Sequence, residues 1–293
     1  MQYGNQLAPL SRNPAYQQEY APGASNYYVN PYFFEILRGQ NSFFPVEGNP
    51  YAGIVDPRLP YYFYNQLTGG QDAENPTAYR NGDFVSIYMF SFNIDPNEGF
   101  DQASSQTVAG LYPIGGRYDD GNGGISNFNG AGDTPQRMLT YFSRLYTQAE
   151  LALVGVTSQD PATLLEDAMQ ASFDKVNEVA FDAGAPVIEQ ADIDDYITEV
   201  MALYDVADDE GKLRHIMTQK WIASFGYGID AYNDYRRTGY PLLHNGNTDN
   251  LTVTVQTRDY PLTYPWKTDD LSVNSNAPNQ KNITLHNVFW DIN

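Results

Sequence analysis

The residue types that most often carry out catalysis are scattered in this sequence. Its three histidines, His215, His244 and His286, lie far apart and in no spacing typical of metal ligands. The chain has no cysteine, which excludes thiol nucleophiles, disulfides and cysteine-ligated metals. No nucleophile elbow, P-loop or dinucleotide-binding fingerprint occurs. The sequence therefore predicts no catalytic residue.

Carboxylates are abundant, with 36 Asp and Glu residues, so a pair at glycosidase spacing could arise by chance. The acidic residues between Asp192 and Glu210 are interpreted as caps and solvated ends of helices. The run 120–124 resembles part of a calcium loop but lacks the glutamate that closes such loops. We expect no metal site and no cofactor, with calcium kept as an alternative.

Aromatic residues beside polar ones are better candidates, because they suit the binding of sugars. A sugar ring offers an apolar C–H face to an aromatic ring, and its hydroxyl rim can be bound by polar side chains. That mixture occurs at 61–66, around 112–120 and in the C-terminal tail. For each ring the alternative is that it packs beneath a loop. The predicted ligand-binding residues are Tyr61, Tyr62, Tyr64, Arg117, Tyr118 and Trp266.

The first part of the chain, residues 1–133, is rich in Gly, Pro, Asn, Asp and Tyr. We expect this loop-rich region to wrap a helical core and to contribute to ligand binding. Within it, 33–37 is predicted as a short helix and 84–90 as a short strand. Residues 115–132 are predicted to form a long surface loop.

Residues 134–293 are predicted as a helical region with a packed tail, forming one structural unit with 1–133. Apolar residues recur at helical spacing, and Asp160-Pro161 is a typical helix start. The predicted helices cover about 138–152, 161–180, 192–204, 210–225 and 229–237. Short turns between amphipathic helices predict hairpins of the TPR kind. The fold class is thus mainly α, with TPR-like hairpins, extensive irregular loops and a few short strands.

Two further expectations concern packing. Trp221 should be buried in the helical core. The tail, 259–293, should pack back onto the body because it carries several aromatic residues, and 251–255 alternates like a short strand.

The net charge of −20 argues against partners that are themselves anionic. Such a surface repels nucleic acid and anionic lipid, so neither is an expected binding partner. No apolar run approaches the length that spans a bilayer, and residues 1–6 do not resemble an export signal. The chain is therefore either cytoplasmic or the C-terminal portion of a longer protein.

Several segments resemble the SusD/RagB family in the order in which the family has them. The longest is 219–241, which contains Gln219-Lys220-Trp221 and ends in Arg236-Arg237-Thr238-Gly239-Tyr240-Pro241. Weaker matches are Asp56-Pro57-Arg58-Leu59, the segment 140–153, Asp259-Tyr260-Pro261 and the end at 288–291. The sequence departs from the family pattern at Phe142-Ser143, where an acidic residue is usual, and at Tyr232, where tryptophan is common. The family's lipidated cysteine and first TPR-type helices have no counterpart.

The resemblance implies an incomplete SusD-like α–α superhelix from a lipoprotein on the extracellular face of the bacterial outer membrane. It implies non-catalytic capture of an oligosaccharide or polysaccharide for a SusC-like, TonB-dependent transporter. The membrane would be reached through an N-terminal lipid anchor that this chain lacks. Two alternatives remain: a RagB-like peptide- or protein-binding lipoprotein, and a glycosidase.

Overall fold

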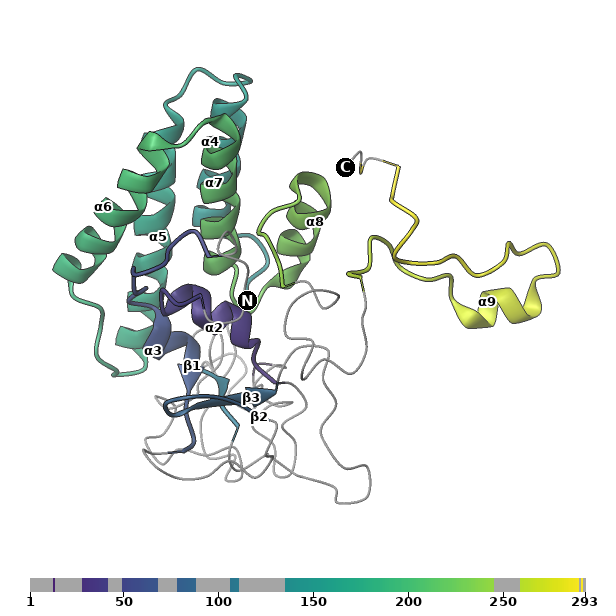
Figure 1. The fold of residues 1–293 in the computed structure, drawn as a ribbon, viewed down its shortest axis with the longest axis horizontal. Helices are drawn as coiled ribbons and strands as arrows, with labels where there is room; N and C mark the ends of the chain where they lie inside the picture. The colour runs from purple at the N-terminus through teal and green to yellow at the C-terminus, as the bar shows by residue number, and fades with distance from the viewer. Residues whose placement is uncertain are drawn as a thin grey trace.

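The computed structural model describes residues 13, 28–41, 49–67, 78–87, 106–110, 135–244, 259–289 and 291. In this part of the chain, helices make up most of the regular structure, and the strands are two to four residues long. The predicted fold class, mainly α with hairpins, loops and short strands, is confirmed. Figure 1 shows the long helices standing side by side above the irregular N-terminal part.

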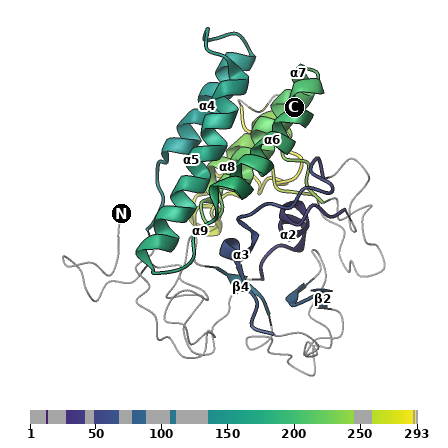
Figure 2. The ribbon, with the colours of Figure 1, turned by 90° about the vertical axis from the view of Figure 1, so that its left-hand side faces the viewer.

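Four helices form two antiparallel hairpins, as predicted (Figures 1 and 2). They are α4 (Tyr141–Leu153), α5 (Pro161–Asp182), α6 (Gln190–Val206) and α7 (Asp209–Ala223). The side chains of Thr140, Asp160 and Asp208 accept a backbone N–H at the start of α4, α5 and α7. These caps satisfy donors that the first helical turn leaves unpaired. The predicted helices are therefore confirmed, with ends shifted by a few residues.

The last helix of the bundle, α8 (Gly228–Thr238), is held to α7 and α4 by a charge cluster. Asp234 pairs with Lys220 of α7 at 2.8 Å and with Arg237 at 2.9 Å. Arg237 also pairs with Glu150 of α4. Gly239 ends the helix with φ 74°, a left-handed conformation that glycine adopts without steric cost.

The N-terminal part supplies short elements that pack under the bundle. The helices are α2 (Pro31–Leu37) and α3 (Leu59–Tyr62), and the strands are β1 (Phe63–Tyr64), β2 (Ala78–Asn81), β3 (Phe84–Ile87) and β4 (Val108–Ala109). β1 pairs with β4, and β2 pairs with β3, both antiparallel. The helix predicted at 33–37 is confirmed in α2, and the strand predicted at 84–90 is confirmed over 84–87 in β3, while 88–90 lie outside the described residues. The predicted loop at 115–132 and strand at 251–255 lie outside the described residues.

One hydrophobic core joins the two parts of the chain. Phe225, just after α7, stacks on Phe33 of α2 at 5.5 Å and on Tyr62 of α3 at 4.4 Å between ring centroids. Buried residues of α4 to α7 belong to the same cluster. The aromatic residues of the irregular part therefore serve largely as core.

A buried ion pair lies at the centre of this core. Arg58 donates to both carboxylate oxygens of Asp56, with the shortest contact at 2.6 Å, and both side chains are 1% exposed or less. The same guanidinium donates to Ser172 of α5 at 2.9 Å and to Gln219 of α7 at 3.3 Å. It also lies 4.4 Å from the ring centroid of Phe173. The segment 56–58 is thereby tied to two helices of the bundle.

The electrostatics of this pair favour its charged form. Burial alone would lower the pKa of Arg58, but the carboxylate of Asp56, together with Tyr62 and Tyr196, holds that pKa well above its usual value. Gln219 continues the network by donating to the hydroxyl of Tyr196 on α6 at 2.8 Å. Burial raises the pKa of Tyr196 well above its usual range. The hydroxyl therefore stays neutral and can accept this hydrogen bond.

The burial of Trp221 and the start of the first long helix differ from the predictions. Trp221 is half-buried, because Phe33 lies against its ring on the core side at 4.7 Å and leaves another part open to a pocket. Met138 does not belong to α4, which begins at Tyr141, and its side chain is 63% exposed.

The tail only partly follows its prediction. Residues 261 and 262 contact α8, since Tyr232 donates to the carbonyl of Pro261 at 2.9 Å and Arg236 to that of Leu262 at 3.1 Å. Tyr260 and Tyr264 also lie edge-on against Tyr235 and Tyr232 of α8, at 5.9 and 6.0 Å between ring centroids. Beyond Tyr264 the tail extends away from the bundle through α9 (Thr268–Val273), as Figure 1 shows. Phe289 is 98% exposed.

Local pairing explains why the tail leaves the body. The backbone N–H and C=O of Trp266 bond the side chain of Gln280, both at 2.8 Å. Leu262 donates to Ile283 across the same two segments at 2.8 Å. The tail thus satisfies backbone groups within itself, and Trp266 and Phe289 stay exposed, whereas Tyr260 and Tyr264 contact α8 as the aromatic content predicted.

Arg58→Met should destabilise the protein by about 3–5 kcal/mol, because it leaves the buried Asp56 carboxylate without its cation. Urea unfolding at pH 7 measures this loss. Lys175→Met is the control, since it removes the more exposed pair with Glu178 and should cost less than about 1 kcal/mol. Equal effects for the two variants would contradict the central role of the Asp56–Arg58 pair.

His215 should make the protein less stable in acid. Burial, with a smaller contribution from Arg214, lowers the pKa of His215 from its usual 6.5 to about 4. Between these values the unfolded chain binds a proton that the folded chain does not, so stability falls as pH drops through this window. At about 1.4 kcal/mol per pKa unit, the loss is up to roughly 3 kcal/mol.

Urea unfolding of His215→Gln at pH 7 and pH 4.5 tests this directly. The variant should lose less stability over this interval than the unmodified protein. His286→Gln changes an exposed histidine and should leave the pH dependence unaltered. An unaltered pH dependence in His215→Gln would show that its protonation is not linked to folding.

Candidate functional site

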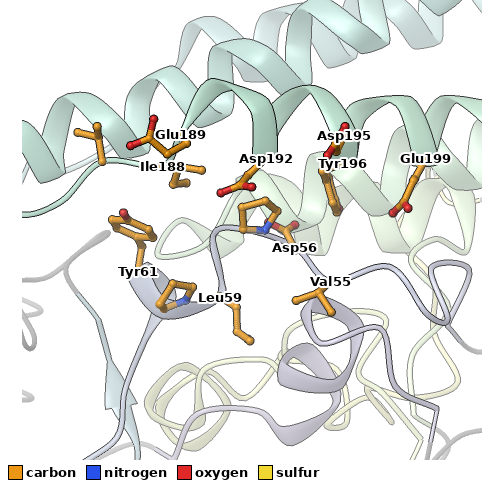
Figure 3. A pocket seen from close by; sticks show the side chains of 13 residues that line it. Val55, Asp56, Leu59, Tyr61, Ile188, Glu189, Asp192, Asp195, Tyr196 and Glu199 are labelled. Atoms are coloured by element: carbon orange, nitrogen blue, oxygen red, sulfur yellow. The ribbon is translucent and has the colours of Figure 1, made fainter.

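A groove of about 560 Å³ lies between the segment 55–61 and the start of α6 (Figure 3). We call it the α3–α6 groove. Its lining residues are Val55, Asp56, Pro57, Leu59, Pro60, Tyr61, Val187, Ile188, Glu189, Asp192, Asp195, Tyr196 and Glu199. Its size is within the range of small-molecule binding sites.

The wall formed by 55–61 is held by the buried ion pair. Asp56 accepts the backbone N–H of Arg58 at 2.9 Å, which fixes the turn before α3. Its carboxylate faces the core, so it contributes little charge to the groove. Pro57, Leu59 and the other apolar residues of this segment give the wall its hydrophobic surface.

Two sets of hydrogen bonds hold the opposite wall in place. The side chain of Asn177 both donates to and accepts from the backbone of Ile188, at 3.0 and 2.8 Å. Tyr61 reaches across and donates to the carbonyl of Pro186 at 2.7 Å. The two walls are therefore connected at one end of the groove.

Carboxylates line the α6 side of the groove. Glu189, Asp192, Asp195 and Glu199 follow one another at three- and four-residue spacing, which places them along one face of the helix. All four are exposed residues. Figure 3 shows Glu189 just before α6 and the other three on the helix, across from Val55, Leu59 and Tyr61. The groove thus combines an apolar wall with a row of strong hydrogen-bond acceptors.

The predicted ligand-binding residues do not come together in this groove. Tyr61 lines it, but its ring is 5% exposed and its hydroxyl is engaged with Pro186. Tyr62 is fully buried in the core, so its ring cannot stack on a ligand. For Tyr62 the alternative, a ring packed beneath other segments, is correct.

The other predicted residues lie elsewhere. Tyr64 is half-buried in β1, opposite Val108. Trp266 lies in the extended tail, 47% exposed, with the Lys281 ammonium 4.5 Å from its ring centroid. Arg117 and Tyr118 are outside the described residues, so their predicted role stays a prediction.

The acidic wall of the groove was not predicted from the sequence. Asp192 and Asp195 were expected to cap and solvate helix ends, and Glu189 and Glu199 were not among the candidate residues. Their helical spacing shows that they share one face. What could not be seen is that this face lies opposite the segment 55–61.

Within the described residues, no group of three or more His, Cys, Asp or Glu residues has an arrangement suited to a metal ion. Across the same residues, no helix has both the length and the hydrophobicity to span a bilayer.

Comparison with known proteins assigns this chain to a family. Residues 48–262 match the SusD-like family model described as starch-binding and associating with the outer membrane. This span contains the whole α3–α6 groove. No curated protein matched the chain significantly.

Solved structures also resemble the chain. A SusD homologue from Bacteroides fragilis aligns with 80% of this chain and 48% of its own, at 18% identity and a TM-score of 0.51, which supports the shared fold. A SusD-like protein from Bacteroidetes aligns at 28% identity over 46% of this chain and 25% of its own, with a TM-score of 0.38. A chitin-binding protein aligns at 22% identity over 74% of this chain and 41% of its own, with a TM-score of 0.47.

The chain spans less than half the length of each of these structures. The family match, in contrast, covers most of the chain, from residue 48 to residue 262. This span includes the helical hairpins and the buried Asp56–Arg58 pair that connects them. The chain therefore belongs to the SusD-like family, whose model is described as starch-binding and associating with the outer membrane.

Proposed function

We propose that this protein captures a neutral oligosaccharide at the extracellular face of the outer membrane and does not cleave it. The observation that carries the proposal is the family match over 48–262, which includes every residue of the α3–α6 groove. Family membership supports glycan binding, while the groove supplies a concave surface where it could occur. The particular glycan remains open, since one fold can serve different ligands.

The two walls of the groove suit the two chemical faces of a sugar. The apolar wall, with Pro57 and Leu59, would cover C–H groups, and the carboxylates of α6 would accept hydrogen bonds from hydroxyls. Such a site orders few groups and buries a modest area. We therefore expect dissociation constants roughly in the micromolar to millimolar range.

The arrangement of the carboxylates supports binding without hydrolysis. A glycosidase places two carboxyl groups on either side of the bond to be cleaved. Here the four exposed carboxylates follow one helix face, and the carboxylate of Asp56 opposite them is buried against Arg58. This arrangement supports our proposal that the groove binds a sugar without hydrolysing it.

The wider role is proposed from the family resemblance. The protein would be held to the membrane by an N-terminal lipid. It would pass the glycan to a SusC-like, TonB-dependent transporter. We propose that neither step requires a cofactor, and that EDTA leaves glycan binding unchanged.

A peptide ligand is the second candidate, and the acidic row of α6 is the observation that favours it. Glu189, Asp192, Asp195 and Glu199 could pair with lysine or arginine side chains of an extended peptide. Such binding would weaken with salt, because the charges involved are exposed. Neutral glycan binding has no comparable salt dependence.

Calorimetry on a panel that includes maltoheptaose, chitohexaose and a lysine-rich peptide tests both candidates. We expect at least one neutral glycan to bind, with an affinity that changes less than about twofold between 50 and 500 mM NaCl. Long incubation followed by product analysis should release no reducing ends. Peptide binding without glycan binding would favour the second candidate, and released reducing ends would refute the non-catalytic role.

Substitutions on α6 test the location of the site. Asp192→Ala and Asp195→Ala should each weaken glycan binding by about tenfold, which corresponds to one lost hydrogen bond to a charged group. Asp194→Ala is the matched control, because Asp194 lies on the same helix but outside the groove. Equal affinities for all three variants would exclude the α3–α6 groove as the glycan site.

A further inference from the structure

A second cavity, of about 270 Å³, lies where α2, β1 and the turn between α7 and α8 meet. We call it the aromatic pocket. It is lined by Val29, Asn30, Phe33, Phe63, Trp221, Ser224, Phe225, Gly226, Tyr227, Gly228 and Ala231. None of these residues lines the α3–α6 groove. The two cavities are therefore separate.

The rings of the pocket are held rigidly by one another. Trp221 meets the face of Phe33 edge-on at 4.7 Å between centroids, and Phe33 is stacked on Phe225 at 5.5 Å. Phe63 contacts Phe225 edge-on at 5.9 Å. Preferred aromatic geometries of this kind fix the orientation of each ring. A ligand would meet a preformed surface and would not need to order it.

Trp221 is the ring best placed to meet a ligand. It is half-buried and lines the cavity, whereas Phe33 and Phe63 are each almost wholly buried at 6% and 5% exposure. Tyr227, also half-buried, adds a ring with a hydroxyl at the turn between α7 and α8. An apolar surface that stays open beside polar groups suits a ligand with both kinds of face.

Polar groups border the rings. The side-chain oxygen of Asn30 caps α2 by accepting the backbone N–H of Tyr32 at 2.9 Å. The amide NH₂ of the same side chain is then the group that can donate to a ligand. Ser224 adds a hydroxyl that donates to the carbonyl of Lys220 and keeps its acceptor lone pairs. Donors and acceptors therefore lie within the same cavity as the exposed ring of Trp221.

We propose that the aromatic pocket is a second sugar subsite, which takes one pyranose ring of a neutral glycan against Trp221. The proposal rests on the glycan-binding function proposed above. A volume of about 270 Å³ is slightly below the range for drug-sized ligands, so the pocket suits a single sugar unit and excludes a longer segment. The apolar face of the ring packs on Trp221, and its hydroxyls meet Asn30 and Ser224.

Gly228 offers a way to fill the pocket without disturbing the fold. A Cβ atom at this position would meet no atom within 4 Å, and the backbone there has no positive φ. Gly228→Phe should therefore fold, and its ring should occupy the cavity. Ile229→Phe is the matched control, because Ile229 is the next residue of α8, 66% exposed and outside the pocket.

Calorimetry with maltoheptaose and chitohexaose is the first measurement. Gly228→Phe should weaken binding of the glycan that the unmodified protein binds by at least about tenfold, and Ile229→Phe should change it by less than twofold. Trp221 fluorescence is the second measurement, in a background with Trp266→Phe and Trp290→Phe. We expect the fluorescence of Trp221 to change saturably when the same glycan is added. Loss of this change in Gly228→Phe would confirm that the glycan binds in the aromatic pocket.

The outcomes separate this proposal from the one on which it rests. Glycan binding that is equal in both variants, without a fluorescence change, would refute the aromatic pocket and leave glycan capture intact. No binding of any glycan by the unmodified protein would refute glycan capture itself, and the subsite with it. A fluorescence response to a phenylalanine-containing peptide, but to neither glycan, would assign the pocket to an apolar side chain.

Discussion

The burial of one ion pair constrains the rest of this structure. Arg58 and Asp56 are withdrawn from water, which is costly unless every donor of the guanidinium finds a partner. Those partners come from α5 and α7, and Gln219 extends the network to α6. The segment 56–58 can therefore adopt its conformation only where three helices meet. The position of the groove wall that follows it, and of α3, is set by this requirement.

Local signals in the sequence were sufficient to predict the helices and their approximate ends. Asp160-Pro161 and Gly239 mark their ends because capping and left-handed turns depend on a few neighbouring residues. The family resemblance was carried mainly by 219–241, and the structure explains the paired charges of that segment as scaffold. Lys220 and Arg237 pair with Asp234, so its charges hold helices together.

The binding surfaces could not be predicted in the same way, because they depend on which distant segments meet. Tyr61 and Tyr62 are adjacent residues of the same type. Tyr61 borders a groove, whereas Tyr62 is enclosed by Phe33 and Phe225. Asp192 has the sequence context of a helix start, and it lines a groove only because the segment 55–61 lies opposite it. The packing of the tail could not be predicted for a related reason, since the side chain of Gln280 pairs with the backbone of Trp266 inside the tail itself.

The α3–α6 groove separates the residues that hold its shape from those that would meet a ligand. Asn177 and Tyr61 fix its walls through hydrogen bonds to Ile188 and Pro186. The carboxylates of α6 project from the helix surface and are not part of that scaffold. Substitution at these exposed positions therefore changes the chemistry of the groove while the buried network stays intact. A lineage with this architecture can acquire new ligand preferences one surface residue at a time, at little risk to folding.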